Sequence, residues 1–299
     1  MERNDLGFGQ KSSSNKARFV TPDGKINVLR KGQPLIRPYD FYHSLISMSW
    51  GKFIFLVSLS FFISNLIFAG FYTFIENQAL SSVNHSSLLQ KYWDSFFFSV
   101  QTMTTVGYGA MSPISSWAKI ISSVESFIGL LGFALVTGLL YGRFSRPEMK
   151  IRYSKNILIS PFKEGKALMF KMANQRSSKL IEAEVTMVLI ANKDGNRIYH
   201  NLDLQLNKIN FFALTWTVVH PINEESFFFN QTEDSLQNLD LEVVILVKAF
   251  DDSFSQTVYS HSSYTYDEFV WNAKFDTSIF QENGKMAIDL NQLDNYTKI

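Results

Sequence analysis

Residues 93–109 read WDSFFFSVQTMTTVGYG. The apolar part of this stretch is long enough for only two or three helical turns, and Asp94 or Ser95 can cap the start of that helix. Two longer apolar stretches flank it: residues 53–75 carry no charge, and residues 120–141 carry one. At 1.5 Å per residue each of these can cross a hydrocarbon core of about 30 Å. The sequence therefore predicts two membrane-spanning helices and, between them, a short helix that re-enters the membrane.

The composition suits a membrane protein with a soluble part, although either span taken singly could be the buried core helix of a soluble protein. Charged residues are 18 % of the 299 residues, below the roughly 25 % of ordinary soluble domains. A net charge of +1 argues against a nucleic-acid partner. The chain has no cysteine, no Walker loop, no dinucleotide-binding glycine motif and no metal-ligand spacing. We therefore expect neither enzyme activity nor a cofactor.

The distribution of basic residues predicts the orientation. Residues 1–52 carry nine lysines and arginines, and five more follow the second span between Arg143 and Lys155. The connection between the spans, residues 76–116, carries only Lys91. By the positive-inside rule both termini are cytoplasmic and the connection is outside. We expect a multi-pass protein of the cell's inner (plasma) membrane.

The string T-V-G-Y-G at residues 105–109 resembles the selectivity filter of potassium channels. In such a filter successive main-chain carbonyls face one axis. This needs backbone angles of alternating hand, and glycine adopts positive φ without a Cβ penalty. Four copies of the loop would replace the water shell of a potassium ion, so the resemblance implies a homotetramer. Potassium ions are expected at the carbonyl oxygens of Thr105, Val106, Gly107 and Tyr108, with Gly109 completing the filter.

Residues 93–109, 137–147 (TGLLYGRFSRP) and 211–222 (FFALTWTVVHPI) resemble the bacterial inward-rectifier potassium channels, and the resemblance extends over roughly residues 35–290. It implies a membrane α-helical pore domain with two spans, made of a slide helix, an outer helix, a pore helix and an inner helix. A cytoplasmic all-β sandwich of immunoglobulin-like fold follows. It also implies passive conduction of potassium ions, gated at the inner helix.

The resemblance and the composition together predict four parts of the chain. These are an N-terminal cytoplasmic segment at 1–34, an interfacial slide helix at 35–52, a transmembrane pore domain at 53–147 and a cytoplasmic β-sandwich domain at 148–299. Within the sandwich, runs of β-branched and aromatic residues predict strands, and two turn signals predict hairpins. The expected strands are 181–190, 211–219 and 241–249, and the expected hairpin turns are 193–196 and 282–285.

Filter support is expected from Gln101, Thr104 and Glu125. Many relatives have glutamate where this chain has Gln101, so a salt bridge from that position is absent here. Glu125 is the only ionisable group within the second span, and such groups are functional candidates by default. By resemblance, the pore-lining face of the inner helix carries Ser126, Phe133, Thr137 and Tyr141.

Phe133 stands where strongly rectifying relatives have an acid that holds polyamines, so we expect weak polyamine block from this position. Phe133 and Tyr141 are expected to gate the pore as apolar constrictions, the alternative being that both pack between helices. Four glycines of the inner helix are either hinges or sites of close helix packing: Gly129, Gly132, Gly138 and Gly142.

Basic side chains gather at the cytoplasmic ends of the spans. Anionic lipid attracts each such base by about 1 kcal/mol, so anionic phospholipids are expected regulators. The alternative is that these residues only anchor the topology. The predicted lipid-binding residues are Lys52, Arg143, Arg146 and Lys150.

Two other functions remain open on the sequence alone. A degraded filter would make a poorly selective cation pore, and a membrane-tethered β-sandwich could serve mainly to bind a partner. Ion flux separates these from a potassium channel.

Overall fold

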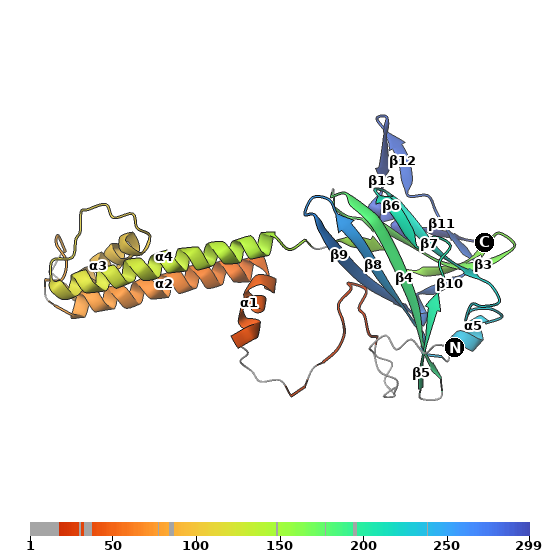
Figure 1. The fold of residues 1–299 in the computed structure, drawn as a ribbon, viewed down its shortest axis with the longest axis horizontal. Helices are drawn as coiled ribbons and strands as arrows, with labels where there is room; N and C mark the ends of the chain where they lie inside the picture. Colours follow the sequence, from red (N-terminus) through yellow and green to blue (C-terminus); the bar gives the residue numbers. More distant parts are fainter. Residues whose placement is uncertain are drawn as a thin grey trace. The chain divides into compact units, whose positions relative to one another are not determined.

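The computed structural model describes residues 18–29, 31–32, 38–76, 78–83, 87–147, 149–176, 178–193, 196–237 and 239–299. The chain forms two compact units (Figure 1). The membrane unit is Gln33–Arg146, and the second unit combines Met1–Gly32 with Pro147–Ile299. Each unit has its own core, and each is described by itself below.

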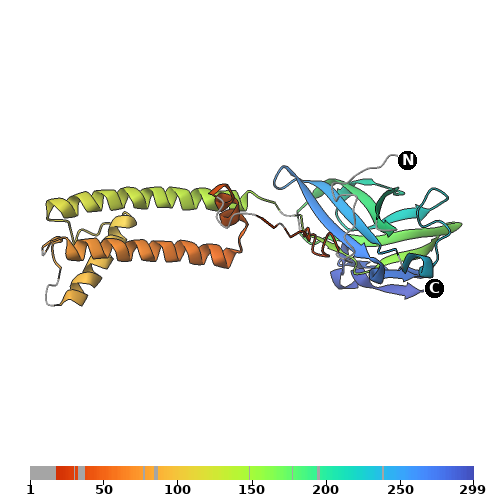
Figure 2. The same ribbon diagram turned by 90° about the horizontal axis from the view of Figure 1, so that it is seen from below.

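Four helices make up the described membrane unit: α1 (Pro38–Ser47), α2 (Trp50–Phe74), α3 (Leu88–Met103) and α4 (Ser116–Phe144). Helices α2 and α4 run side by side, and α3 packs mainly on α2 (Figures 1 and 2). Both long helices are apolar enough to span a membrane, with mean hydropathies of 2.1 and 1.8. Helix α2 begins three residues before the predicted span and ends one residue before its end, and α4 extends beyond the predicted span at both ends, because helical structure continues into the polar flanks. Ser115, for example, caps α4 by accepting a hydrogen bond from the Ala118 amide.

The pore helix α3 begins earlier than predicted. Neither Asp94 nor Ser95 caps it, since both lie inside the helix. The cap is Ser87, whose side chain accepts a hydrogen bond from the Gln90 amide at 3.2 Å. The prediction was wrong because it placed the helix start at the beginning of the strongly apolar run, whereas the first two turns of α3 are amphipathic.

The two ends of the connection between the spans are tied together. The Ser81 amide donates to the Ser112 carbonyl at 2.8 Å, and the Ile114 amide donates to Ala79 at 2.9 Å. Beneath them a small core packs α2, α3 and α4 around Tyr72, whose ring meets Phe98 edge to face at 5.0 Å between centroids. The loop after α3 is therefore held at both ends by the same membrane unit.

The second unit is a sandwich of two five-stranded sheets. One sheet contains β1 (Ile151–Tyr153), β2 (Ile157–Phe162), β3 (Gly165–Asn174), β7 (Thr215–Ile222) and β10 (Phe269–Trp271). The other contains β4 (Leu180–Lys193), β5 (Asn196–Leu202), β6 (Lys208–Phe212), β8 (Glu242–Asp251) and β9 (Gln256–Thr265). Two ribbons pair β11 (Ala273–Phe275) with β14 (Tyr296–Lys298), and β12 (Ile279–Glu282) with β13 (Lys285–Ile288). A short helix, α5 (Glu233–Gln237), precedes β8.

The core of the sandwich lies between the two sheets. Leu168 and Phe170 from β3 and Leu189 and Ile245 from the facing sheet are fully buried in one cluster. Apart from the parallel pair β2–β10, all strand pairs of the described sheets are antiparallel. The predicted antiparallel sandwich is therefore confirmed in its architecture.

The predicted strand 211–219 is wrong as a single strand. The chain leaves β6, which pairs with β4, and enters β7, which pairs with β3 in the other sheet, so it crosses between the sheets at residues 213–214. The two hairpins are confirmed. Lys193 pairs with Asn196, although the turn residues between them lie outside the described residues. Asn283 and Gly284 adopt φ values of 51° and 75°, as a two-residue type I′ turn requires.

An N-terminal arm, residues 18–29, lies against the sandwich. The carboxylate of Glu242 accepts hydrogen bonds from the amides of Phe19 and Val20 at 2.8 and 3.1 Å. Arg18 forms an ion pair with Glu268 at 3.0 Å, and Val20 is buried. The polar composition of residues 1–34 gives no hint of this docking, which joins residues more than 220 positions apart in the sequence.

Candidate functional site

The T-V-G-Y-G loop has the alternating backbone that its chemistry demands. Thr105, Gly107 and Gly109 adopt positive φ values of 58°, 53° and 79°, whereas Val106 and Tyr108 between them do not. Two of the three left-handed positions are glycine, which bears no Cβ penalty. Thr105 bears one of about 1–2 kcal/mol, so the surrounding structure must hold it.

The start of the loop is fastened to the end of the pore helix. The Gln101 carbonyl accepts hydrogen bonds from the amides of Val106 and Gly107 at 3.0 and 3.3 Å. The Thr104 hydroxyl donates to the Val100 carbonyl at 2.6 Å. Gln101 thus acts here through its main chain. Although these bonds fix its start, the loop is exposed in the single chain at residues 104–110.

A polar cluster lies behind the loop, and Glu125 is at its centre. The Tyr72 hydroxyl donates to Glu125 Oε2 at 2.6 Å, and the Ser99 hydroxyl makes a close contact with Oε1. Ser99 Oγ also donates to Asn65 Oδ1 at 2.9 Å. All four side chains are buried, and they join α2, α3 and α4. Glu125 therefore faces the back of the pore helix, as a supporting residue would.

Gly129 brings the inner helix against the end of the pore helix. A Cβ at this position would lie 2.3 Å from the main-chain oxygen of Met103, the residue before Thr104. A Cβ at Gly142 would lie 3.1 Å from the Tyr42 hydroxyl and from Ile46 Cδ1, both on α1. A Cβ at Gly132 or Gly138 would meet nothing within 4 Å in the described chain. Close packing therefore accounts for Gly129 and Gly142.

The predicted pore-lining side chains lie along one side of α4. Phe133 and Tyr141 are each 74 % exposed in the single chain, and Thr137 is also exposed. Ser126 is half-buried, one residue after Glu125. Large aromatic side chains standing free on an apolar helix are available to line a pore or to contact another subunit.

Arg143 has contacts that the sequence did not suggest. Its guanidinium donates to the carbonyls of Leu45, Ile46 and Met48 at 2.6, 2.9 and 2.6 Å, at the C-terminal end of α1. It also lies over the ring of Trp50 at 4.7 Å. A cation at the C-terminal end of a helix caps its carbonyls and opposes its dipole. Arg143 therefore links the inner helix to α1, whereas Lys52, Arg146 and Lys150 are exposed.

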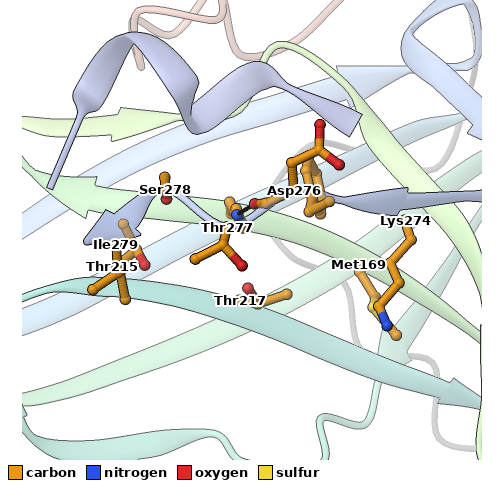
Figure 3. Close-up of a pocket in the computed structure, with 10 residues that line it drawn as sticks. Met169, Thr215, Thr217, Lys274, Asp276, Thr277, Ser278 and Ile279 are labelled. Carbon is orange, nitrogen blue, oxygen red and sulfur yellow. Dashed lines mark hydrogen bonds between the residues drawn. The ribbon is translucent and has the colours of Figure 1, made fainter. Parts of the chain in front are cut away.

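A hollow of about 300 Å³ lies in the sandwich near the β11–β12 connection (Figure 3). Met169, Thr215, Thr217 and the segment 274–279 line it. Lys171 lies buried at its edge, where its ammonium group donates to the Asp276 carbonyl and faces the ring of Phe275. Burial lowers the pKa of Lys171. The motifs of the sequence gave no sign of this hollow.

Comparison with known proteins places these features in a family. Residues 60–146 match an ion channel domain, and residues 151–299 match the inward rectifier potassium channel C-terminal domain. The chain is 34 % identical over 290 residues to the inward rectifier potassium channel Kirbac3.1 of Paramagnetospirillum magnetotacticum, covering 94 % of this chain and 96 % of that protein. The chain belongs to the inward rectifier potassium channels.

More distant members of the family match as well. Over 316 residues the chain is 26 % identical to the ATP-sensitive inward rectifier potassium channel 12 of Gallus gallus, covering 96 % of this chain and 73 % of that protein. Over 323 residues it is 24 % identical to the inward rectifier potassium channel 18 of Homo sapiens, covering 96 % and 72 %. The family and the two apolar helices confirm a membrane-embedded potassium channel, not an enzyme, with potassium as permeant ion and no cofactor.

Sequence reasoning missed three members of the cluster behind the filter. Tyr72, Ser99 and Asn65 carry no motif, and only their positions in space show that they form one hydrogen-bonded cluster with Glu125. Asn65 offered a usable signal, because it is a buried amide in the middle of an apolar span and such residues need a partner. The residue roles predicted for the filter, the gate and the lipid contacts stay predictions.

Proposed function

We propose that four copies of this chain form a homotetramer in the plasma membrane, with both termini in the cytoplasm, and that potassium ions pass along a central filter. The ions bind the carbonyl oxygens of residues 105–108 after losing their water. Gln101, Thr104 and Glu125 hold the filter from behind. Phe133 and Tyr141 narrow the inner part of the pore, with Ser126 and Thr137 on the same face.

One observation carries this proposal: positive φ at every second residue from 105 to 109, in a loop that its own chain leaves exposed. Alternating backbone hand turns successive carbonyls toward the same side, which makes a ladder of oxygens. One such ladder cannot surround an ion, whereas four around an axis can. The exposure of the loop in one chain fits burial against three others.

Flux into potassium-loaded liposomes tests the proposal. The purified channel should take up rubidium, be blocked by barium and discriminate strongly against sodium. G107A should abolish selectivity, because alanine is strained at φ 53°. G70A is the matched control, since a Cβ on α2 at that position meets nothing within 4 Å. Equal permeability to sodium and potassium in the unmodified chain would favour a poorly selective pore, and absence of flux would favour a binding module.

The orientation can be tested directly, because the chain has no cysteine of its own. A single cysteine at Val83, in the connection between the spans, should react with a membrane-impermeant thiol reagent added to intact cells. A cysteine at Lys298, in the last strand, should react only after lysis. The reverse pattern would contradict cytoplasmic termini.

Anionic lipid is proposed to regulate the channel through Lys52, Arg146 and Lys150, which are exposed and near the ends of the spans. Arg143 joins this set only through its charge, since its guanidinium is engaged with α1. Flux in vesicles with and without anionic phospholipid should differ, and a variant with all three lysine and arginine side chains replaced by glutamine should lose most of that difference. An unchanged lipid response would leave these residues as topological anchors.

A further inference from the structure

The hydrogen bonds behind the filter have a defined direction, and Asn65 on α2 sets it. The Asn65 side-chain nitrogen donates to the Phe61 carbonyl at 2.7 Å. A main-chain carbonyl can only accept, so this bond fixes the amide with its nitrogen toward Phe61 and its oxygen toward Ser99. The amide oxygen can only accept as well. It therefore takes the single proton of the Ser99 hydroxyl, over 2.9 Å.

The other side of Ser99 then lacks a proton. Ser99 Oγ is also in close contact with Glu125 Oε1. If Glu125 were ionised, two acceptors would face each other across this contact, which is unfavourable in a buried site. A proton on Oε1 removes the conflict, because the carboxyl O–H then donates to Ser99. The second carboxyl oxygen, Oε2, accepts from the Tyr72 hydroxyl at 2.6 Å.

In the part of the chain that the structure describes, the charged side chains near the cluster provide no counter-charge that would stabilise an ionised Glu125. Tyr72 is the titratable group bonded to its carboxyl. The other charged side chains on these helices lie at least four residues from the cluster member on their own helix: Lys52 on α2 and Glu76 just after it, Lys91 and Asp94 on α3, and Lys119 and Arg143 on α4. Within the described residues no ion pair to Glu125 is found. An unpaired carboxylate in a membrane span is expensive, whereas a neutral acid is not.

We propose that Glu125 is a neutral carboxylic acid in the folded channel, and that Asn65 is the positioning residue that imposes this state by taking the Ser99 proton. The proposal rests on the role of Glu125 as a support of the filter. It makes the support a directed chain of bonds, from Glu125 to Ser99 to Asn65 to the Phe61 carbonyl, which ties the inner helix through the pore helix to the outer helix without placing a charge beside the permeant ions.

Infrared spectroscopy tests the protonation state without relying on ion flux. The difference spectrum between the wild-type channel and E125Q at about pH 7 should show the loss of a carbonyl band of a protonated carboxylic acid. Loss of carboxylate bands alone would overturn the proposal. Because this readout needs no conduction, it also separates failure of this inference from failure of the proposed channel function.

The role of Asn65 is tested by N65L, which has a similar shape but no acceptor for the Ser99 proton. With that proton free to turn toward Glu125, the carboxyl group can ionise, so the acid band should be lost as the pH is raised, and rubidium flux should become pH-dependent with it. N65L/E125Q should be insensitive to pH again. S58L, a change of a polar to an apolar side chain on the exposed face of α2, is the matched control and should behave as the wild type.

An acid band in N65L as insensitive to pH as in the wild type would show that Asn65 does not impose the neutral state. A merely structural role of Asn65 would lower assembly or flux equally at all pH values, and E125Q would not rescue it. If N65L fails to assemble, N65A provides the same test with a smaller side chain, since it also removes the acceptor and leaves the Ser99 proton free to turn toward Glu125.

Discussion

Replacing Gly129 by alanine should disturb the filter from behind. The new Cβ would lie 2.3 Å from the Met103 carbonyl oxygen and 3.0 Å from its carbon, and ordinary contacts of this kind begin at 3.4 Å. The inner helix or the end of the pore helix must therefore move by roughly 1 Å. All the atoms in the way belong to the main chain, so no side-chain rotation relieves the contact. Met103 directly precedes Thr104, so the movement reaches the filter.

The magnitude follows from two opposing effects. Alanine in place of glycine in a helix interior gains roughly 0.5–1 kcal/mol. Overpacking a tight contact costs typically about 1–3 kcal/mol. G132A on the same helix should show only the gain, because its Cβ would meet nothing within 4 Å. The difference between the two variants, about 1–3 kcal/mol, isolates the contact with Met103 and corresponds to roughly 5–150-fold in an equilibrium constant.

The assay compares G129A with G132A in two ways. Thermal dissociation of the proposed tetramer in detergent should begin at a lower temperature for G129A. Liposome flux should show a lower preference for rubidium over sodium for G129A, while G132A keeps the wild-type preference. Equal stability and equal selectivity of the two variants would refute the view that Gly129 is required for the approach of the inner helix to Met103.

Further predictions concern the gate, α1 and the sandwich. R143K should increase hydrogen exchange in α1 nearly as much as R143M, because a lysine cannot reproduce three hydrogen bonds and the contact with Trp50; wild-type exchange in R143K would instead favour a purely electrostatic role. Y141A should raise flux if that ring narrows the pore, and unchanged or lower flux counts against the gate. Burial lowers the pKa of His220. Below about pH 6.5 the unfolded chain therefore binds more protons than the folded sandwich, so the thermal stability of the sandwich should decrease as the pH falls below that value. H220Q should show a smaller loss by circular dichroism, and an identical loss would assign the effect to other groups.

The alternating backbone of residues 105–109 and the two spans could be predicted because their physics is local. A charge-free run of more than twenty residues leaves few alternatives to a membrane helix, and carbonyls turned to one side demand glycine at alternate positions. The exact ends of the helices could not be predicted, because Ser87 and Ser115 cap them from polar segments that carry no stronger signal than Asp94 or Ser95.

The sandwich shows where local patterns fail. Residues 211–219 read as one strand, because every residue type in the run suits a sheet. The chain nevertheless changes sheets at residues 213–214. This crossing is determined by the pairing of β6 with β4 and of β7 with β3, and not by the residue types in the run. The docking of the N-terminal arm could not be predicted for the same reason. Glu242 and Glu268, which bind the arm, lie far away in the sequence.

The cluster around Glu125 could be predicted only in part. The sequence singles out Glu125 as a functional candidate, but its role could not be derived from the sequence. A single acidic residue in a membrane span indicates a functional site, but its function depends on the side chains that it contacts. Ser99 is 26 residues away and Tyr72 is 53 away, so no spacing rule connects them. What the structure adds is direction: Asn65 can only accept from Ser99, and this single constraint passes along the bonds to the carboxyl group. A residue without charge and without a motif thus determines the chemical state of the one acid in the inner helix.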